Sequence, residues 1–285
     1  MTAPVVGLVV HVDRPVALDL ARRAATWLRE RGVEVRMPVD EAVAVGLPEV
    51  ACAPEEFPDG LDVAISLGGD GTMLRAVDLV YEGGAAVFGV NVGHLGYLTE
   101  VESGDLDLVL ERLLAGEYEV LERMMIEVVV TSQGPAGGRW WALNEAVLEK
   151  VRGRMVRLAV SINGTFFTTY AADGVIVATP TGSTAYSFSA RGPIVSPRHR
   201  CLVLTPVSPH MLFDRALVLD AEEELGFEVV EDDAVALALD GRDLGTLAAG
   251  DVVTCTGSAR PARVVAFGPR DFHQILKAKF GLADR

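Results

Sequence analysis

The sequence predicts two domains, an α/β domain built on a parallel sheet and a β-rich domain that follows it. Over about the first hundred residues, short apolar runs alternate with amphipathic helical patterns, which is typical of parallel strands joined by helices. After about residue 120, short apolar runs follow one another with only turn residues between them, which is typical of antiparallel sheets. A chain of 285 residues is long enough to give each of two domains its own buried core.

The candidate strands of the α/β domain are the apolar runs Val5–Val10, 33–37, 62–67 and 85–90. The first run is followed by a helical pattern in which Asp13 is the expected cap and Pro15 lies in the first turn, and which ends at Gly32. The third run leads directly into the sequence GGDGT and a second helical pattern over residues 73–81. Strands separated by helices in this way are expected to pair in parallel.

The candidate strands of the β-rich domain are 124–131, 140–149, 155–162, 165–170, Gly174–Ala178, Cys201–Val207, 225–230, 234–239, 251–255 and 263–267. Asn163-Gly164 joins two of them and is typical of a type I′ hairpin turn. Residues 271–280 have helical spacing. We therefore expect a Rossmann-like α/β domain over residues 1–120, a β-sandwich-like domain over 121–268, and a C-terminal helix within 269–285 that packs back on the first domain.

The composition excludes several classes of protein. Half of the residues are hydrophobic, which excludes a disordered polyelectrolyte. The net charge of −15 disfavours binding to nucleic acid or to an anionic membrane, because both need a basic surface, although residues 150–200 carry a net charge of +6. Three scattered cysteines, no signal peptide and no apolar segment long enough to span a membrane predict a cytoplasmic protein without a disulfide scaffold.

The sequence Gly68-Gly69-Asp70-Gly71-Thr72 stands between a predicted strand and a predicted helix. Its glycines permit a close approach of the backbone to a ligand, and the first amides of a helix favour phosphate. Because a carboxylate repels phosphate, we expect Asp70 to accept a proton from a substrate hydroxyl or to help to hold Mg²⁺. The alternative is a plain strand-to-helix turn with Asp70 or Thr72 as N-cap. The chain has no P-loop, no protein-kinase signature and no GxGxxG fingerprint.

Three further features are candidate binding elements. Residues 179–189 are rich in hydroxyl side chains around Gly182 and offer many donors, although an ordinary loop has a similar composition. Asn144-Glu145 lies within an apolar run, where an amide and a carboxylate can bind a base edge and a ribose diol; the alternative is a strand end that faces solvent. Asn91 follows a predicted strand at the edge where open α/β sheets bind ligands, and its alternative is a turn residue.

Together these blocks resemble the NAD kinase family. The resemblance rests on GGDGT at 68–72, NVGHLGYLTE at 91–100, NE at 144–145, Asp173 in the sequence ADG, and TPTGSTAYSFSARGP at 179–193, which occur in the family's order and spacing. GGDGT alone is shared with lipid kinases of the diacylglycerol type and with relatives of phosphofructokinase. Its combination with NE and TPTGSTAY is much more specific.

The resemblance implies transfer of the γ-phosphoryl group of ATP, or of polyphosphate in some members, to the 2′-hydroxyl of the adenosine ribose of NAD, which gives NADP. It implies that Mg²⁺ enters with ATP and is not held by fixed protein ligands. It also implies NAD and ATP as small-molecule partners, a homodimer or homotetramer, and a site formed between the two domains.

The family's functional residues correspond to particular positions of this chain. Asp70 matches the aspartate regarded as the acceptor of the hydroxyl proton. Asn144 and Glu145 match residues that hold the adenosine portion of NAD, and Asp173 matches an aspartate near its nicotinamide end. The other candidate contacts of substrate are Gly68, Gly69, Gly71, Thr72, Arg75, Asn91, Arg154, Thr181, Thr184, Ala185, Tyr186, Ser187, Phe188 and Ser189.

The chain departs from the family pattern at two positions. Arg242 stands where the family often has glutamine, so no binding role is assigned to the preceding Asp240-Gly241, which is interpreted as a hairpin turn. Ala171 stands where some members have arginine. Two alternative functions are a lipid or sugar kinase that uses GGDGT, which the NE and TPTGSTAY blocks disfavour, and an NAD-binding sensor without turnover, which the intact GGDGT disfavours.

Overall fold

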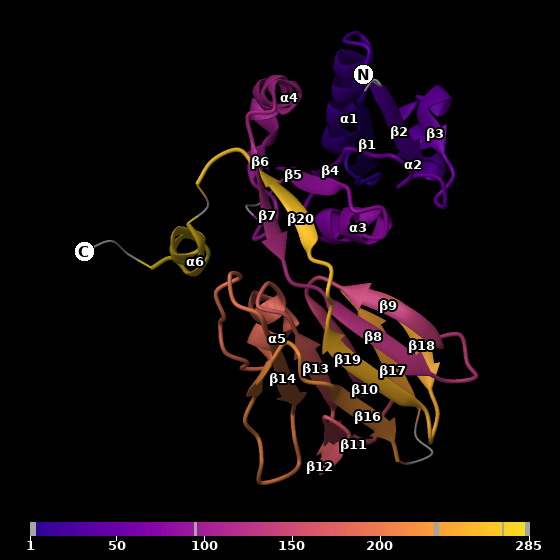
Figure 1. The fold of residues 1–285 in the computed structure, drawn as a ribbon, viewed down its shortest axis with the longest axis vertical. Coiled ribbons are helices and arrows are strands. Elements are labelled where there is room, and N and C mark those ends of the chain that lie inside the picture. The colour runs from indigo at the N-terminus through magenta and orange to yellow at the C-terminus, as the bar shows by residue number, and fades with distance from the viewer. Residues whose placement is uncertain (1–3, 94–95, 231–233, 270, 283–285) are drawn as a thin grey trace. The chain divides into compact units, whose positions relative to one another are not determined.

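A computed structural model of the chain describes residues 4–93, 96–230, 234–269 and 271–282. They form two compact units (Figure 1). Unit 1 contains the described residues up to Glu122 and those from Ala262 onward, and unit 2 contains Arg123–Pro261. No helix among the described residues is both long and apolar enough to span a membrane.

Unit 1 is built on one sheet, in which seven strands follow the order β3-β2-β1-β4-β5-β20-β7 and β6 pairs with β5. The strands are β1 (Val5–Val10), β2 (Glu34–Pro38), β3 (Ala51–Cys52), β4 (Val63–Gly68), β5 (Ala86–Asn91), β6 (Val101–Glu102), β7 (Glu119–Arg123) and β20 (Ala262–Ala266). The central pairs β2–β1, β1–β4 and β4–β5 are parallel, as the alternation of strands and helices predicts.

Helices complete unit 1. They are α1 (Pro15–Arg29), α2 (Val39–Val45), α3 (Asp70–Val80), α4 (Leu106–Ala115) and α6 (Phe272–Phe280), with 3₁₀ turns at Pro48–Val50 and Ser103–Asp105. Leu20, Ala24 and Leu28 of α1 are buried together with the apolar residues of β1 and β4 in a single hydrophobic core. The expectation that Asp13 caps α1 is wrong: Arg14 is the N-cap, because Pro15 occupies the first helical position and favours an extended residue before it.

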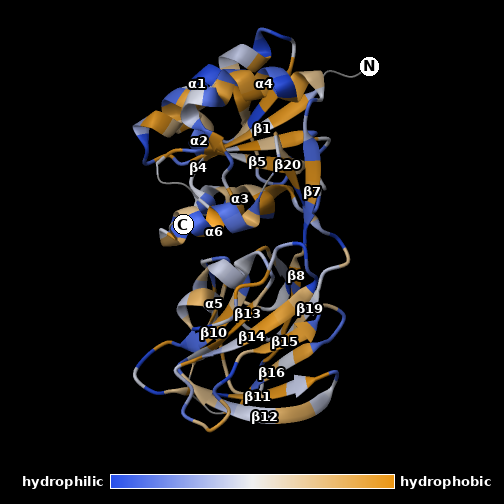
Figure 2. Cartoon of the chain, turned by 90° about the vertical axis from the view of Figure 1, so that its left-hand side faces the viewer, coloured by the Kyte–Doolittle hydropathy of each residue, from blue (hydrophilic) through white to orange (hydrophobic). Residues whose placement is uncertain are grey.

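Unit 2 is a sandwich of two six-stranded antiparallel sheets with a shared core. One sheet has the order β15-β14-β13-β10-β17-β18 and the other the order β12-β11-β16-β19-β8-β9. The strands are β8 (Ile126–Thr131), β9 (Gly138–Ala142), β10 (Glu145–Lys150), β11 (Val156–Ile162), β12 (Thr165–Ala172), β13 (Gly174–Ala178), β14 (Cys201–Val207), β15 (Leu217–Asp220), β16 (Leu225–Val229), β17 (Val235–Leu239), β18 (Arg242–Leu247) and β19 (Val252–Gly257). Figure 2 shows that hydrophobic residues predominate along the strands of the sandwich.

The predicted hairpin at Asn163-Gly164 is confirmed, since both residues have positive φ, 51° and 73°. Two predictions in the β-rich part are wrong. The single strand expected over 140–149 is two strands, β9 and β10, because the chain leaves one sheet at residues 143–144 and enters the other. The run 263–267, assigned to the β-rich domain, corresponds to β20 of unit 1, where Val264 pairs in parallel with Val87. An apolar run alone does not specify which sheet completes its hydrogen bonds.

Candidate active site

Asp70 lies in unit 1, where strand β4 ends and helix α3 begins. Gly69 is the N-cap of α3, and Asp70 is the first helical residue. The carboxylate of Asp70 accepts hydrogen bonds from three consecutive backbone amides, those of Tyr97 (2.8 Å), Leu98 (3.0 Å) and Thr99 (3.3 Å). Because the donors are backbone groups, they determine the orientation of both carboxylate oxygens.

The glycines of GGDGT have different surroundings. A Cβ atom on Gly68 would lie 2.2 Å from Oγ1 of Thr72, whose side chain is buried. A Cβ atom on Gly69 or Gly71 would meet no described atom within 4 Å outside the adjacent backbone of the helix itself. Gly68 and Thr72 therefore pack against each other, whereas the backbone at Gly69 and Gly71 is open to a ligand. The N-cap is Gly69, so the alternative of Asp70 or Thr72 as N-cap is wrong.

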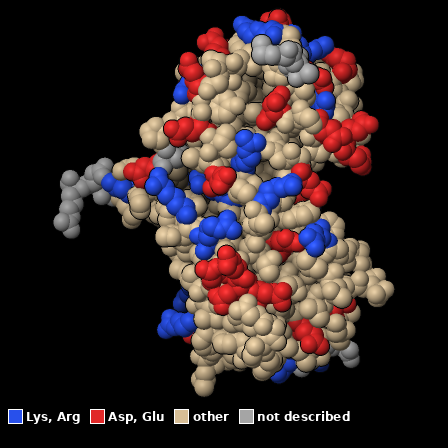
Figure 3. Space-filling model, viewed as in Figure 1, with Lys and Arg blue, Asp and Glu red and all other residues tan. Residues whose placement is uncertain are grey.

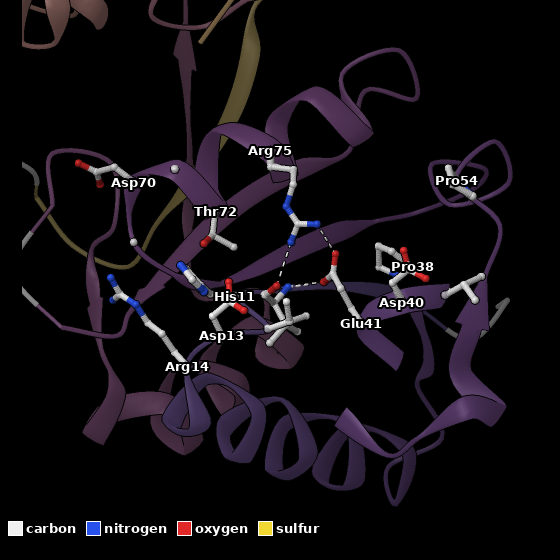
Figure 4. A pocket seen from close by; sticks show the side chains of 15 residues that line it. His11, Asp13, Arg14, Pro38, Asp40, Glu41, Pro54, Asp70, Thr72 and Arg75 are labelled. Atoms are coloured by element: carbon white, nitrogen blue, oxygen red, sulfur yellow. Dashed lines mark hydrogen bonds and ion pairs between the residues drawn. The ribbon is translucent and has the colours of Figure 1, made fainter. Parts of the chain in front are cut away.

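A pocket of about 670 Å³ lies beside this turn, at the carboxyl ends of β1 and β4 (Figure 4). This is the edge of a parallel sheet at which ligands bind. The ionisable side chains in its lining are those of His11, Asp13, Arg14, Asp40, Glu41, Asp70 and Arg75. Figure 4 shows Arg75 and Glu41 pointing toward each other and Arg14 on the side of Asp70. The pocket thus combines two guanidinium groups with the amides of a helix start.

Arg75, a predicted contact, is held in place by other residues of unit 1. Its guanidinium pairs with the carboxylate of Glu41 and donates to the carbonyl oxygen of Val10 at 2.9 Å. Glu41 also accepts a hydrogen bond from the amide of Val10. Burial raises the pKa of Glu41, and the charge of Arg75 opposes that shift. A guanidinium group has five N–H donors, so the two bonds leave it able to donate to a phosphate.

Asn91 is the last residue of β5, and the alternative of a turn residue is wrong. Its side chain is buried, and Nδ2 donates to the carbonyl oxygen of Gly93 at 3.3 Å and to Glu102 at 3.5 Å. Oδ1 has no hydrogen-bond partner within the described part of the chain, which leaves out residues 94 and 95. A buried amide oxygen of this kind is an acceptor for a ligand or for ordered water.

Asn144 and Glu145 lie in unit 2 at the start of β10 and are 8% and 7% exposed, so the alternative of a strand end that faces solvent is wrong. Burial raises the pKa of Glu145 to about 8, and the negative charge of Asp240 adds to that shift. The backbone amide of Tyr186 donates to Glu145 and opposes it. Oε2 of Glu145 has no hydrogen-bond partner among the residues described. The pair therefore offers an amide and a carboxyl group with acceptor capacity left for a ligand.

The hydroxyl-rich segment 179–189 folds against Asn144. Oγ1 of Thr179 donates to the carbonyl oxygen of Leu143 at 2.6 Å, and its amide donates to that of Asn144 at 2.8 Å. A Cβ atom on Gly182 would lie 2.0 Å from the carbonyl oxygen of Asn144. The segment then forms the 3₁₀ turn Gly182–Thr184 and the short helix α5 (Tyr186–Ser189). Only glycine at position 182 permits this close approach.

The predicted contacts in this segment differ in their exposure. Tyr186, Phe188 and Ser189 are exposed, and Thr181, Thr184 and Ala185 are half-buried. Ser187 is fully buried, and its hydroxyl lies 2.9 Å from that of Thr205. The side chain of Ser187 therefore faces the interior of unit 2, and a contact with a ligand stays a prediction for it.

Asp173 forms an ion pair with Lys150, with 2.5 Å between Oδ1 and Nζ. Burial raises the pKa of the neighbouring Tyr186, and a hydrogen bond with Glu149 adds to that shift. Arg154 is exposed in the turn that follows β10. On the face drawn in Figure 3, acidic and basic side chains are interspersed. Asp173 is the single acidic residue of the 150–200 window, so this ion pair is already included in its net charge of +6.

Three residues that contact predicted site residues are absent from the sequence-based prediction: Glu41, Lys150 and Asp240. Arg14, which lines the pocket together with Asp70, is absent from it as well. Arg14 and Glu41 belong to no motif, and Lys150 was recognised only as part of the basic window. Asp240 was assigned to a hairpin turn alone. An aspartate before glycine at a turn is also a residue type that caps neighbouring backbone amides, and this is the signal that would have identified it.

Comparisons with known proteins cover nearly the whole chain. Residues 6–118 match the profile of the ATP-NAD kinase N-terminal domain, and residues 143–267 match that of the ATP-NAD kinase C-terminal domain. An NAD kinase of Symbiobacterium thermophilum is 43% identical, over 97% of this chain and 98% of its own length. An NAD kinase of Syntrophotalea carbinolica is 39% identical, over 98% of this chain and 99% of its own length.

Two solved structures share the fold at low sequence identity. The yeast NADH kinase, solved in complex with NADH, is 24% identical and superposes with a TM-score of 0.90 over 100% of this chain and 89% of its own. An NAD kinase from Archaeoglobus fulgidus, solved in complex with ATP, is also 24% identical, with a TM-score of 0.71 over 98% of each chain. The predicted fold class, an α/β domain followed by a β-sandwich, is confirmed.

Proposed function

The chain belongs to the NAD kinase family, and from this premise we propose that it transfers the γ-phosphoryl group of ATP to the 2′-hydroxyl of the adenosine ribose of NAD, which gives NADP. The observation that carries the proposal is the placement of Asp70, a carboxylate held by three amides at the start of α3 and at the wall of a pocket. Inorganic polyphosphate is the alternative donor.

In this proposal the residues of unit 1 hold the donor and accept the proton. The phosphates lie against the backbone of Gly69 and Gly71, where the first amides of α3 lack intrahelical partners. Arg75 and Arg14 supply positive charge from the pocket lining. The 2′-oxygen forms a bond to the γ-phosphorus while the bond from that phosphorus to the bridging oxygen of ADP breaks. The proton of the hydroxyl passes to the carboxylate of Asp70.

Mg²⁺ is expected to enter with ATP. Within the described part of the chain, no group of three or more His, Cys, Asp or Glu side chains is arranged to hold a metal ion. Mg²⁺ is commonly bound mainly by substrate phosphates and water, so an ion that enters with ATP needs no preformed set of protein ligands. When bound, the ion neutralises charge on the phosphates.

The residues of unit 2 are proposed to bind NAD. The amide of Asn144 and the carboxyl group of Glu145 suit a base edge and ribose hydroxyls of the adenosine portion, because both are buried and Oε2 of Glu145 has no partner among the described residues. Asp173 and the 181–189 segment are proposed to contact the rest of the dinucleotide. We also expect a homodimer or homotetramer, which sedimentation velocity measures directly.

The deciding experiment is an assay of NADP formation. The purified protein is incubated with NAD, Mg²⁺ and either ATP or polyphosphate, and NADP is measured with an NADP-specific dehydrogenase. We expect turnover with ATP, and a loss of roughly 10²–10⁴-fold in kcat for Asp70→Asn, which is the usual contribution of a positioned base. Absence of NADP with either donor would contradict the proposal. Full turnover by a folded Asp70→Asn variant would contradict the role of Asp70.

A further inference from the structure

Asp240 connects a hairpin turn to the segment that carries Asn144 and Glu145. It is the first residue of the turn between β17 and β18, with φ of +50°, and Gly241 follows with φ of +80°. Its carboxylate accepts hydrogen bonds from three consecutive backbone amides at the start of β10. Oδ2 accepts from Leu143 at 2.7 Å, and Oδ1 accepts from Asn144 at 2.7 Å and from Glu145 at 3.0 Å.

The same backbone segment is held by further bonds from both sides. The amide of Asp240 donates to the carbonyl oxygen of Glu145 at 3.0 Å. From the other side, Thr179 bonds to both Leu143 and Asn144. The chain passes from one sheet to the other at residues 143–144, and Glu145 is the first residue of β10, so this segment does not have the full hydrogen bonding of a strand interior. The carboxylate of Asp240 therefore supplies acceptors that the sheet does not.

The hairpin itself does not require a carboxylate. Another turn of this kind in unit 2 uses Asn163 and Gly164, with φ of 51° and 73°, nearly the same backbone conformation. The side-chain oxygen of Asn163 accepts a single amide, that of Glu224, at 2.9 Å. An asparagine thus satisfies the turn, whereas accepting three amides through two oxygens requires an aspartate. The identity of Asp240 is explained by what it holds across the sheet, not by the turn.

We propose that Asp240 is a positioning residue of the NAD site: it holds the backbone of Asn144 and Glu145 in the geometry that binds the dinucleotide, and it places a fixed negative charge beside Glu145. This inference rests on the proposed function, because it takes Asn144 and Glu145 as contacts of NAD. Asp240 is not expected to touch the substrate, and its effect passes through these two residues.

The charge of Asp240 has a consequence for binding. Burial is the largest cause that raises the pKa of Glu145 to about 8, and the charge of Asp240 is the second. The hydrogen bond from the amide of Tyr186 lowers that pKa. The residue opposite Glu145 in the neighbouring strand is Ala178, which carries no charge. The phenol of Tyr186 bonds to Glu149. Asp240 is therefore the charged group that acts on Glu145 in the described structure. Ribose hydroxyls donate to a carboxylate, so NAD binding below about pH 8 releases a proton from Glu145.

The test measures NAD binding by calorimetry, without ATP, from pH 5.5 to 9, for the wild type and for Asp240→Asn. Two buffers of different ionisation enthalpy report the protons released. For the wild type we expect affinity to rise with pH toward about 8. For Asp240→Asn we expect NAD binding weakened at least tenfold, the midpoint of the pH dependence moved to lower pH, and an unchanged KM for ATP.

Asp243→Asn is the matched control, because Asp243 lies in the same hairpin and, among the described residues, its carboxylate accepts a hydrogen bond only from the nearby amide of Gly245, at 2.8 Å. Asp243→Asn should leave unchanged both the affinity for NAD and the midpoint of its pH dependence. Asp240→Glu keeps the charge, and should weaken binding while leaving the midpoint near that of the wild type. It is the second variant if Asp240→Asn does not fold.

A readout without substrate separates this inference from the proposed function. The carboxyl carbon of Glu145 is titrated by NMR in the wild type and in the variants, and its midpoint should fall in Asp240→Asn only. An unchanged midpoint, or an equal loss of NAD and ATP affinity in Asp240→Asn, would overturn the role of Asp240. A wild type that makes no NADP, but in which these shifts are seen, would overturn the proposed function and leave the electrostatic coupling standing.

Discussion

The carboxylate of Asp70 fills the space in which Gly96 has no side chain. A Cβ atom at position 96 would lie 2.0 Å from Oδ1 of Asp70 and 2.6 Å from Oγ1 of Thr99. The next three amides along the chain, those of residues 97–99, donate to the same carboxylate. The turn that begins at Gly96 therefore surrounds Asp70 and leaves no room for a side chain of its own unless the carboxylate moves.

Gly96→Ala is expected to displace Asp70 and to lower kcat by roughly 10²–10⁴-fold, the contribution of a positioned base. The displaced group is the end of a short, partly exposed side chain, so the melting temperature should change little. The control is Gly104→Ala, since Gly104 is exposed and a Cβ there meets nothing within 4 Å. A folded Gly96→Ala variant with wild-type kcat would show that the position of Asp70 does not matter.

Much of unit 1 follows from local patterns in the sequence. Val5–Val10 is a strand with the predicted bounds, because a short β-branched run that ends at a turn favours an extended conformation. Helix α3 begins three residues before the predicted 73–81, since the apolar periodicity starts only at Met73 while GGDGT already supplies the first turn. Helices α2 and α4 were not predicted, because their short apolar patterns resemble those of loops and strands.

The candidate site was predictable only where a motif identifies it. Asp70, Asn144 and Glu145 belong to motifs, and the structure gives each a defined hydrogen-bonding environment. The contacts that hold them come from positions far away in sequence: Glu41 lies 34 residues from Arg75, and Asp240 lies 96 residues from Asn144. Long-range pairs of this kind depend on the tertiary fold, which local periodicity does not specify.

Gly182→Ala is expected to impair NAD binding and to destabilise unit 2. The new Cβ would lie 2.0 Å from the carbonyl oxygen of Asn144, and a backbone atom held by Thr179 cannot move aside as a side chain can. We expect the KM for NAD to rise at least tenfold and the midpoint of denaturant unfolding to fall. Gly268→Ala, at an exposed position with open space, is the control. Wild-type values for both quantities would contradict the close packing at Gly182.

Arg75→Met is expected to act on both stability and donor binding. It leaves the buried carboxylate of Glu41 without its cation and removes a donor from the pocket. We expect a loss of roughly 1–3 kcal/mol in the free energy of unfolding, less than for a fully buried pair because the side chain of Arg75 is half-exposed. The KM for ATP should rise by about tenfold, the effect of one lost charge-assisted hydrogen bond.

The double variant Arg75→Met with Glu41→Gln separates these two effects. It should regain part of the stability, since the buried charge is gone, while the KM for ATP stays high. The KM for NAD should be unchanged in all of these variants. The contradicting outcome is additivity. If the free energy of unfolding falls further from Arg75→Met to the double variant, by as much as Glu41→Gln alone lowers it, the two residues are not coupled in the way the ion pair implies.

The pKa of Glu145 also predicts how the stability of the ligand-free protein depends on pH. In the folded protein it is raised to about 8 from the ordinary value of 4.5, first by burial and then by Asp240. Between these two values the folded protein holds a proton that the unfolded chain has released, so stability should decrease as pH rises from about 4.5 to 8 and then level off. At about 1.4 kcal/mol for each pKa unit, the contribution amounts to a few kcal/mol.

Glu145→Gln removes this pH-dependent contribution, so the stability of this variant relative to the wild type should increase steadily from pH 5 to 8. Urea unfolding at several pH values measures the difference, with Glu228→Gln as the control for the loss of an exposed carboxyl group from the same unit. A difference that does not change with pH for Glu145→Gln would mean that Glu145 is already ionised in the folded protein at neutral pH.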